Sequence, residues 1–145
     1  MQFPALITEL GQTLGMKLAL PESGTCGVIF DEDEVSFELN DGRLFIMADI
    51  APAEGHEADL PRLLRAANLG LETGYACIGI DDKSGQFTLC RILEGDWTYP
   101  DFEKALSVFV LAVRYWRDWL ALPASGAAKS SEFEPFDLQA GALRI

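Results

Sequence analysis

The spacing of apolar residues predicts a helix at the start of the chain. Apolar side chains recur there every three or four positions, which is the pattern of one buried helix face. Pro4 suits the first turn of this helix, and Gly15 suits its end. The apolar face consists of Phe3, Leu6, Ile7, Leu10 and Leu14.

Two further helices are predicted later in the chain. A short one is expected over 59–68, where Pro61 fits the first turn and Gly70 the end. A long one opens at Pro100 and runs to about Leu122. Its centre is apolar nearly all round, which predicts that this part is buried.

Between the first two helices the pattern changes to strands. The runs TCGVIF and VSFEL flank an acidic loop over 31–34, and the strand RLFIMADI follows. The dipeptide Asp41-Gly42 before that last strand is typical of a tight hairpin turn. This region therefore predicts three consecutive antiparallel strands.

A second hairpin is predicted between the short helix and the long one. The runs GYACIGID and QFTLCRIL face each other across the turn-forming residues 82–85. The order of elements becomes α-β-β-β-α-β-β-α, which predicts an α+β domain with a five-stranded antiparallel sheet and three helices. Residues 1–122 are expected to form this domain, and residues 123–145, which lack periodicity, a flexible acidic tail.

Composition limits the classes of partner. The formal net charge is −12 at pH 7, which repels the phosphate backbone that nucleic-acid-binding proteins neutralise. The longest apolar run, 108–113, is far shorter than the roughly 20 residues of a membrane helix. We therefore expect no nucleic-acid partner and no membrane contact, and a soluble, cytoplasmic protein.

The residues that carry catalytic or metal chemistry elsewhere are few and scattered. The single histidine, His56, lies in the polar segment AEGHEAD, and the acidic loop over 31–34 lacks the spacing of a calcium loop. Cys26, Cys77 and Cys90 form no CxxC pair, and all three lie in apolar strands. The sequence therefore predicts no catalytic site, no metal site and no cofactor.

Several segments together resemble a known family. The opening segment ELGQTLGMKLALPESGTCGVIFDEDEVSFEL, the segments LLRAANLG and IGIDDKSGQFTLCRIL, and the final helix DFEKALSVFVLAVRYWRDWL are similar to the class I type III secretion chaperones of the Tir-chaperone family. The resemblance covers about residues 3–122. It implies an acidic homodimer that binds a non-globular segment near the N-terminus of a secreted effector. Such a chaperone keeps the segment export-competent without ATP.

Hairpin geometry indicates where that client segment binds. With Asp41-Gly42 as a two-residue turn, Phe37 pairs with Ile46 on the core face, under the long helix. The opposite face then gathers three apolar side chains among polar neighbours. We expect this patch and the first helix to form the client groove, made of Ile29, Phe45, Met47, Leu6 and Leu10. The alternative is that the first helix covers the patch within the monomer.

The resemblance also indicates a dimer interface on the second helix and the strand after it. The candidate contacts are Leu63, Ala67, Tyr75 and Cys77. The alternative interpretation is that these residues belong to the core of the monomer.

A four-residue loop over 82–85 pairs Asp81 with Gln86 and so places Cys77 opposite Cys90. Both cysteines are expected to remain thiols in the cytoplasm.

Three other functions are compatible with the sequence. The first is a regulator of the same fold that sequesters a transcription-control partner. The second is a small-ligand-binding or enzymatic α+β domain, and the third is a structural subunit of a larger assembly. A chaperone is distinguished by co-purification with the N-terminal segment of one effector.

Overall fold

The computed structural model describes residues 2–123. Its three helices are α1 (Gln2–Leu14), α2 (Leu60–Ala67) and α3 (Tyr99–Ala121). Short 3-10 turns, η1 (Glu57–Asp59) and η2 (Asn68–Gly70), flank α2. The predicted acidic tail over 123–145 lies almost wholly outside the described residues and stays a prediction.

The five strands form one antiparallel sheet, as predicted. In chain order they are β1 (Thr25–Phe30), β2 (Asp33–Asn40), β3 (Arg43–Pro52), β4 (Cys77–Ile80) and β5 (Gln86–Leu93). In space their order is β1-β2-β3-β5-β4, so the second hairpin joins the sheet through β5. The α+β fold with three helices is therefore confirmed.

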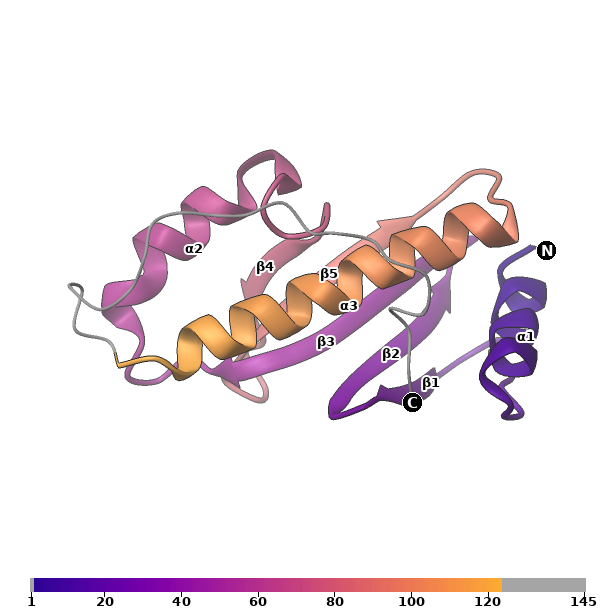
Figure 1. Cartoon of the computed structure of the whole chain (residues 1–145), viewed down its shortest axis with the longest axis horizontal. Helices are drawn as coiled ribbons and strands as arrows, with labels where there is room; N and C mark the ends of the chain where they lie inside the picture. The colour runs from indigo at the N-terminus through magenta and orange to yellow at the C-terminus, as the bar shows by residue number, and fades with distance from the viewer. Residues whose placement is uncertain (1, 124–145) are drawn as a thin grey trace.

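The helices pack on one face of this sheet. α3 runs the length of the sheet, with α1 at the end near β1 and β2 and α2 beside β4 (Figure 1). The Tyr99 hydroxyl hydrogen-bonds to the Thr13 hydroxyl and ties α3 to α1 at 3.0 Å. At the other end of α3, the Trp116 indole N–H donates to the carbonyl of Glu72, just after α2, at 2.7 Å.

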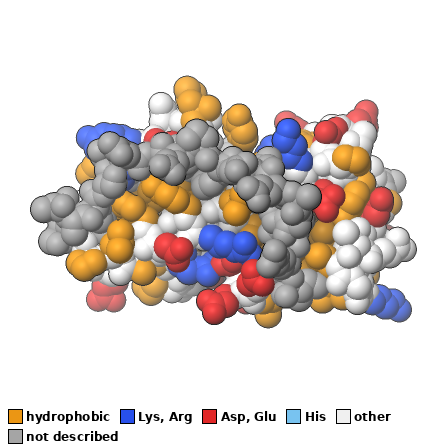
Figure 2. Space-filling model, viewed as in Figure 1, with side chains coloured by type: hydrophobic (Ala, Val, Ile, Leu, Met, Phe, Trp, Pro, Cys, Tyr) orange, Lys and Arg blue, Asp and Glu red, His pale blue; other side chains and the backbone are white. Residues whose placement is uncertain are grey.

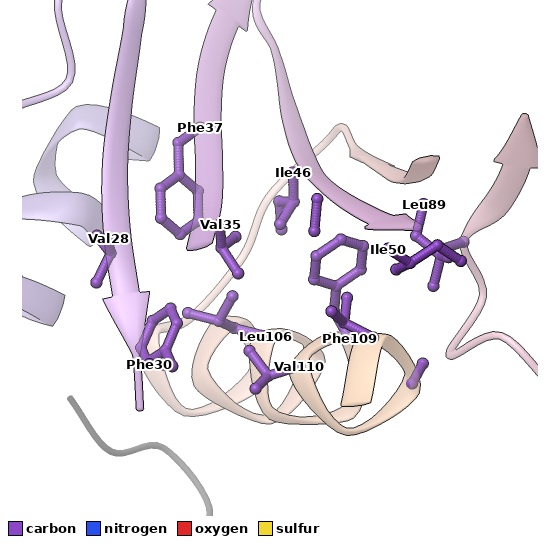
Figure 3. Close-up of a cluster of buried hydrophobic side chains, with 14 of the residues drawn as sticks. Val28, Phe30, Val35, Phe37, Ile46, Ile50, Leu89, Leu106, Phe109 and Val110 are labelled. Carbon is purple, nitrogen blue, oxygen red and sulfur yellow. The ribbon is translucent and has the colours of Figure 1, made fainter. Parts of the chain in front are cut away.

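The core lies between α3 and the sheet. Side chains from β1, β2, β3 and β5 meet those of α3 in Figure 3. Those drawn and labelled there are Val28, Phe30, Val35, Phe37, Ile46, Ile50, Leu89, Leu106, Phe109 and Val110, all of them buried. Each large apolar side chain buried in this way contributes roughly 1.5–3 kcal/mol relative to an exposed one. Among the described residues, no helix is long and apolar enough to cross a membrane.

The register of two hairpins confirms the predictions. Phe37 pairs with Ile46 across β2 and β3, and Asn40 pairs with Arg43 at the turn. Across β4 and β5, Cys77 pairs with Cys90. Alternation along these strands therefore places the predicted core residues under α3.

The predicted connection between β1 and β2 is wrong. The expected four-residue loop over 31–34 is a two-residue turn, because Phe30 pairs with Asp33. Asp31 allows this turn by adopting a left-handed conformation, with φ of 58°. Ile29 consequently pairs with Glu34, whereas the sequence predicted Ser36.

Asp33 explains why the turn is tight. Its carboxylate is buried, with 2% of the residue exposed, and it forms ion pairs with Arg114 and Arg117 of α3. Arg114 also pairs with Asp31 at 3.2 Å. Pairing with two guanidinium groups offsets the cost of removing this carboxylate from water and fixes the β1–β2 turn against α3.

The predicted strand GYACIGID is also shorter in the structure. β4 begins at Cys77, because the preceding residues form a compact turn in which the Tyr75 amide donates to the Gly70 carbonyl at 2.8 Å. Tyr75 itself has a φ of 63°, which ends any extended conformation there.

Replacing Asp33 with alanine tests the ion-pair cluster. We expect Asp33→Ala to lower the free energy of unfolding by about 2–3 kcal/mol, because Arg114 and Arg117 both lose this buried carboxylate, while Arg114 keeps its pair with Asp31 and both retain partial access to water. Chemical denaturation measures the change. Glu32→Ala, at the exposed position next to it, is the control, with an expected change within about 0.5 kcal/mol. Equal effects of both substitutions would contradict a specific role for Asp33.

Candidate functional site

One face of the sheet has no helix over it within residues 2–123. Side chains that point away from α3 lie on this face, which we call the open face. Its apolar members on the central strands are Phe45 and Met47 of β3 and Ile92 of β5, and Ile29 of β1 lies toward the edge. Ile29 is 53% exposed and Ile92 44% exposed, while Phe45 and Met47 are half-buried. Large apolar side chains on a solvated sheet face indicate a contact surface.

Phe45 is the centre of the apolar part of the open face. It pairs with Ile92 on one side and with Glu38 on the other. The guanidinium carbon of Arg43 lies 5.5 Å from the centroid of its ring, a cation–π arrangement. Phe45 is thus held in place while part of its ring remains accessible.

The predicted cluster of Ile29, Phe45 and Met47 is looser than expected. Met47 shares a row with Ser36, as predicted, but Ile29 lies beside Glu34 because of the tight β1–β2 turn. All three side chains still share the open face, because a register change of two residues preserves the face.

Leu6 and Leu10 of α1 do not line the open face. Both are buried in the core, on the side of the sheet that carries α3. The expectation that Leu6 and Leu10 of α1 complete a groove with Ile29, Phe45 and Met47 is therefore wrong. The alternative that α1 covers the patch does not hold either, because α1 packs on the other face.

An acidic hollow adjoins the apolar part of the open face. It has a volume of about 350 Å³, and its lining comes from four strands and the β4–β5 turn. Asp49, Asp81 and Glu34 contribute carboxylates to it, next to Met47 and Cys90. Partial burial raises the pKa of Asp49, and the charges of Asp81 and Glu34 raise it further. The open face is therefore apolar in its middle and strongly acidic at one end.

A second apolar surface lies around α2 and β4. Figure 2 shows apolar side chains standing out from this part of the molecule. Leu64 is 70% exposed and Leu69 77% exposed, values unusual for leucine. We call this the α2–β4 surface; its large exposed members are Leu64, Leu69, Leu71, Tyr75 and Ile80.

Only one predicted dimer contact belongs clearly to the α2–β4 surface. Tyr75 is exposed there, whereas Leu63 is buried within the protomer and Ala67 is half-buried. Cys77 points to the open face, because it alternates with Ile78 and Ile80 along β4. The monomer-core alternative therefore applies to Leu63.

Sequence reasoning missed four members of the α2–β4 surface. Leu64 immediately follows the inward-facing Leu63 in α2. Which of the two leucines faces the core depends on how this short helix is rotated about its axis. Leu69 lies where η2 departs from helical geometry, with φ of 61°. The sequence did contain one indication of this surface. The leucines over 63–71 are more than one helix face can bury.

Tyr75 is held firmly at the edge of this surface. The guanidinium carbon of Arg91 lies 5.5 Å from the centroid of the Tyr75 ring and 5.9 Å from that of Trp97. Arg91 also donates to the Gly74 carbonyl at 3.4 Å, and burial lowers its pKa. An aromatic ring fixed in this way loses little entropy when a partner covers it.

His56, the single histidine, lies between Asp59 and Phe87. Its Nδ1 lies 2.8 Å from an Asp59 carboxylate oxygen, and its ring meets Phe87 edge-on. Within residues 2–123, no group of three or more His, Cys, Asp or Glu side chains is arranged to hold a metal ion.

Comparison with known proteins identifies the family. The model of the Tir chaperone protein (CesT) family matches residues 5–117. The chain therefore belongs to this family, which confirms the resemblance to type III secretion chaperones. No curated protein matches the chain significantly.

Solved structures show the same fold. The ExsC-ExsE complex contains a chain similar to this one, with a TM-score of 0.70 at 23% identity, covering 86% of this chain and 96% of that chain. A chain of the HopA1-SchA chaperone-effector complex is similar with a TM-score of 0.66 at 22% identity, covering 79% of this chain and 91% of that chain. The structure of the Yersinia pestis type III secretion chaperone SycH, in complex with a stable fragment of YscM2, has a TM-score of 0.61 at 19% identity. The match covers 77% of this chain and 97% of that chain.

Proposed function

We propose that this chaperone binds an extended, non-globular segment near the N-terminus of a secreted effector with the open face of its sheet. The bound segment stays unfolded and export-competent, and no ATP is used. One observation carries the proposal: Phe45, Met47 and Ile92 form an apolar strip on a sheet face that has no helix over it. Membership of the Tir chaperone family supports the class of client.

Side-chain chemistry on the open face suits an extended segment. Alternate side chains of such a segment project to one side, so they can contact Phe45 and Met47 while the intervening ones face water. The carboxylates of Glu34 and Asp49 lie beside the apolar strip and favour a client with basic residues there. Binding of this kind requires contact area and no catalytic group, so we propose that the protein is not an enzyme and acts in the cytoplasm before export.

We further propose that two copies associate through the α2–β4 surface. Tyr75, Leu69 and Leu71 supply aromatic and aliphatic area typical of the centre of a stable interface. The open faces of both copies remain available, because the α2–β4 surface lies beside the helix-covered face of the sheet. A dimer therefore offers two client-binding faces to one effector segment.

Charges placed on the open face test client binding. The double variant Phe45→Asp, Met47→Asp is expected to fold, with a loss below about 2 kcal/mol because both side chains retain contact with water. It should lose co-purification with the N-terminal segment of the secreted protein encoded next to it. The measurement is co-expression and affinity purification, with the melting temperature of the free chaperone recorded in parallel.

The matched control adds the same charge elsewhere. Ala58→Asp, Ala121→Asp changes two exposed alanines, one in η1 and one at the end of α3, and should retain the client. A folded open-face variant that still binds would refute the proposal, and so would an unfolded one, because it would show that Phe45 and Met47 belong to the core.

The dimer is tested at Leu64 and Leu69. Leu64→Glu, Leu69→Asn should give a folded monomer, because both leucines are exposed in the protomer and asparagine tolerates the left-handed backbone at position 69. Light scattering at micromolar concentration measures the mass. The contrasting variant, Leu63→Glu, places a charge in the core and should unfold the protein. A wild-type mass of one chain would remove the dimer proposal.

A further inference from the structure

Three sulfur-containing side chains lie in one row across neighbouring strands. Met47 of β3 pairs with Cys90 of β5, and Cys90 pairs with Cys77 of β4. Paired residues in an antiparallel sheet point to the same face, so all three side chains are on the open face. Cys26, the remaining cysteine, pairs with Phe37 and points to the core face.

The spacing of this sulfur row suits a metal ion. Directly opposite residues in an antiparallel sheet have Cβ atoms about 4.5–5.5 Å apart. An ion bound to two thiolates at about 2.3 Å each holds the sulfur atoms no more than about 4.6 Å apart. Cys77 and Cys90 can therefore bind one ion between them without movement of the backbone. Met47 lies on the other side of Cys90, and its long, flexible side chain makes it the third sulfur donor of the row.

The sulfur row is open to solvent and to cations. Cys77 is exposed, while Cys90 and Met47 are half-buried and line the acidic hollow. Burial raises the pKa of the Cys90 thiol, and the neighbouring Cys77 and Glu38 raise it further. The register places Cys77 directly opposite Cys90, and the carboxylates of the adjoining hollow favour an incoming cation.

The ligand set selects the kind of ion. Magnesium and calcium require oxygen ligands, and structural zinc requires four ligands of the Cys and His type, which the described residues do not assemble. Thiolate and thioether ligands in low number favour soft ions, above all Cu(I). We propose that Cys77 and Cys90, assisted by Met47, bind one Cu(I) ion per chain.

Proton and electron balance is simple for this site. Each thiol that is protonated before binding releases one proton to water, and copper enters and remains as Cu(I). No oxidant takes part. Oxidation of the two thiols to a disulfide removes both ligands, so the site exists only in the reduced protein.

The proposal is tested by titration with Cu(I) itself. The full-length reduced chain, without client, competes anaerobically with a chromogenic Cu(I) chelator, with ascorbate as reductant. We expect about one ion per chain for the wild type. Cys77→Ser should weaken binding by more than about 100-fold, above the upper range seen for residues that only support metal ligands.

Further variants distinguish copper binding at the sulfur row from copper binding at any thiol of the chain. Cys90→Ser should match Cys77→Ser, and Met47→Leu should give a smaller but measurable loss. Cys26→Ser should leave affinity unchanged, because its thiol lies on the other face of the sheet. Since Cys77 is exposed, its serine variant is expected to melt at the wild-type temperature, which keeps the test independent of folding.

Three results would overturn the proposal. The first is a wild-type chain that fails to compete with the chelator, the second is binding that survives in Cys77→Ser, and the third is binding that falls equally in Cys26→Ser. None of these results touches the client-binding proposal, because that test measures effector co-purification.

Discussion

The packing of α3 along one face of the sheet is the constraint on which the rest of the structure depends. Phe109 of α3 lies against Ile46 and Leu106 against Val35, and this packing decides which side of every strand is core (Figure 3). The ion pairs from Arg114 and Arg117 to Asp33 extend the contact to the β1–β2 turn. Because α1 and α2 pack beside α3, the opposite face of the sheet has no helix over it within residues 2–123.

An antiparallel sheet with one solvated face normally alternates apolar and polar residues. In this protein β3 departs from that rule, since Phe45 and Met47 stand where polar residues are expected. A negative charge of −12 keeps such a surface from associating indiscriminately. The apolar strip and the charge around it together favour an intermittent partner, which accords with membership of a chaperone family.

Much of the fold was predictable because local signals agreed with one another. Apolar periodicity gave α1 and α3, and Asp41-Gly42 fixed the register of β2 and β3. The β1–β2 turn was not predictable from the acidic run alone, because its length depends on ion pairs between Asp33 and arginines about 80 residues away. The side of the sheet on which α1 packs and the outward direction of Leu64 likewise depend on tertiary packing, so part of the candidate site could be found only in three dimensions.

The central claim is that the open face binds the client, and methyl NMR tests it most directly. The chaperone is labelled at its Ile and Met methyl groups and titrated with the effector segment that co-purifies with it. The account predicts that signals of Ile29, Met47 and Ile92 shift or broaden, while that of the buried Ile46 changes little. Shifts confined to Ile80 or Met16, with Ile29, Met47 and Ile92 unchanged, would contradict it.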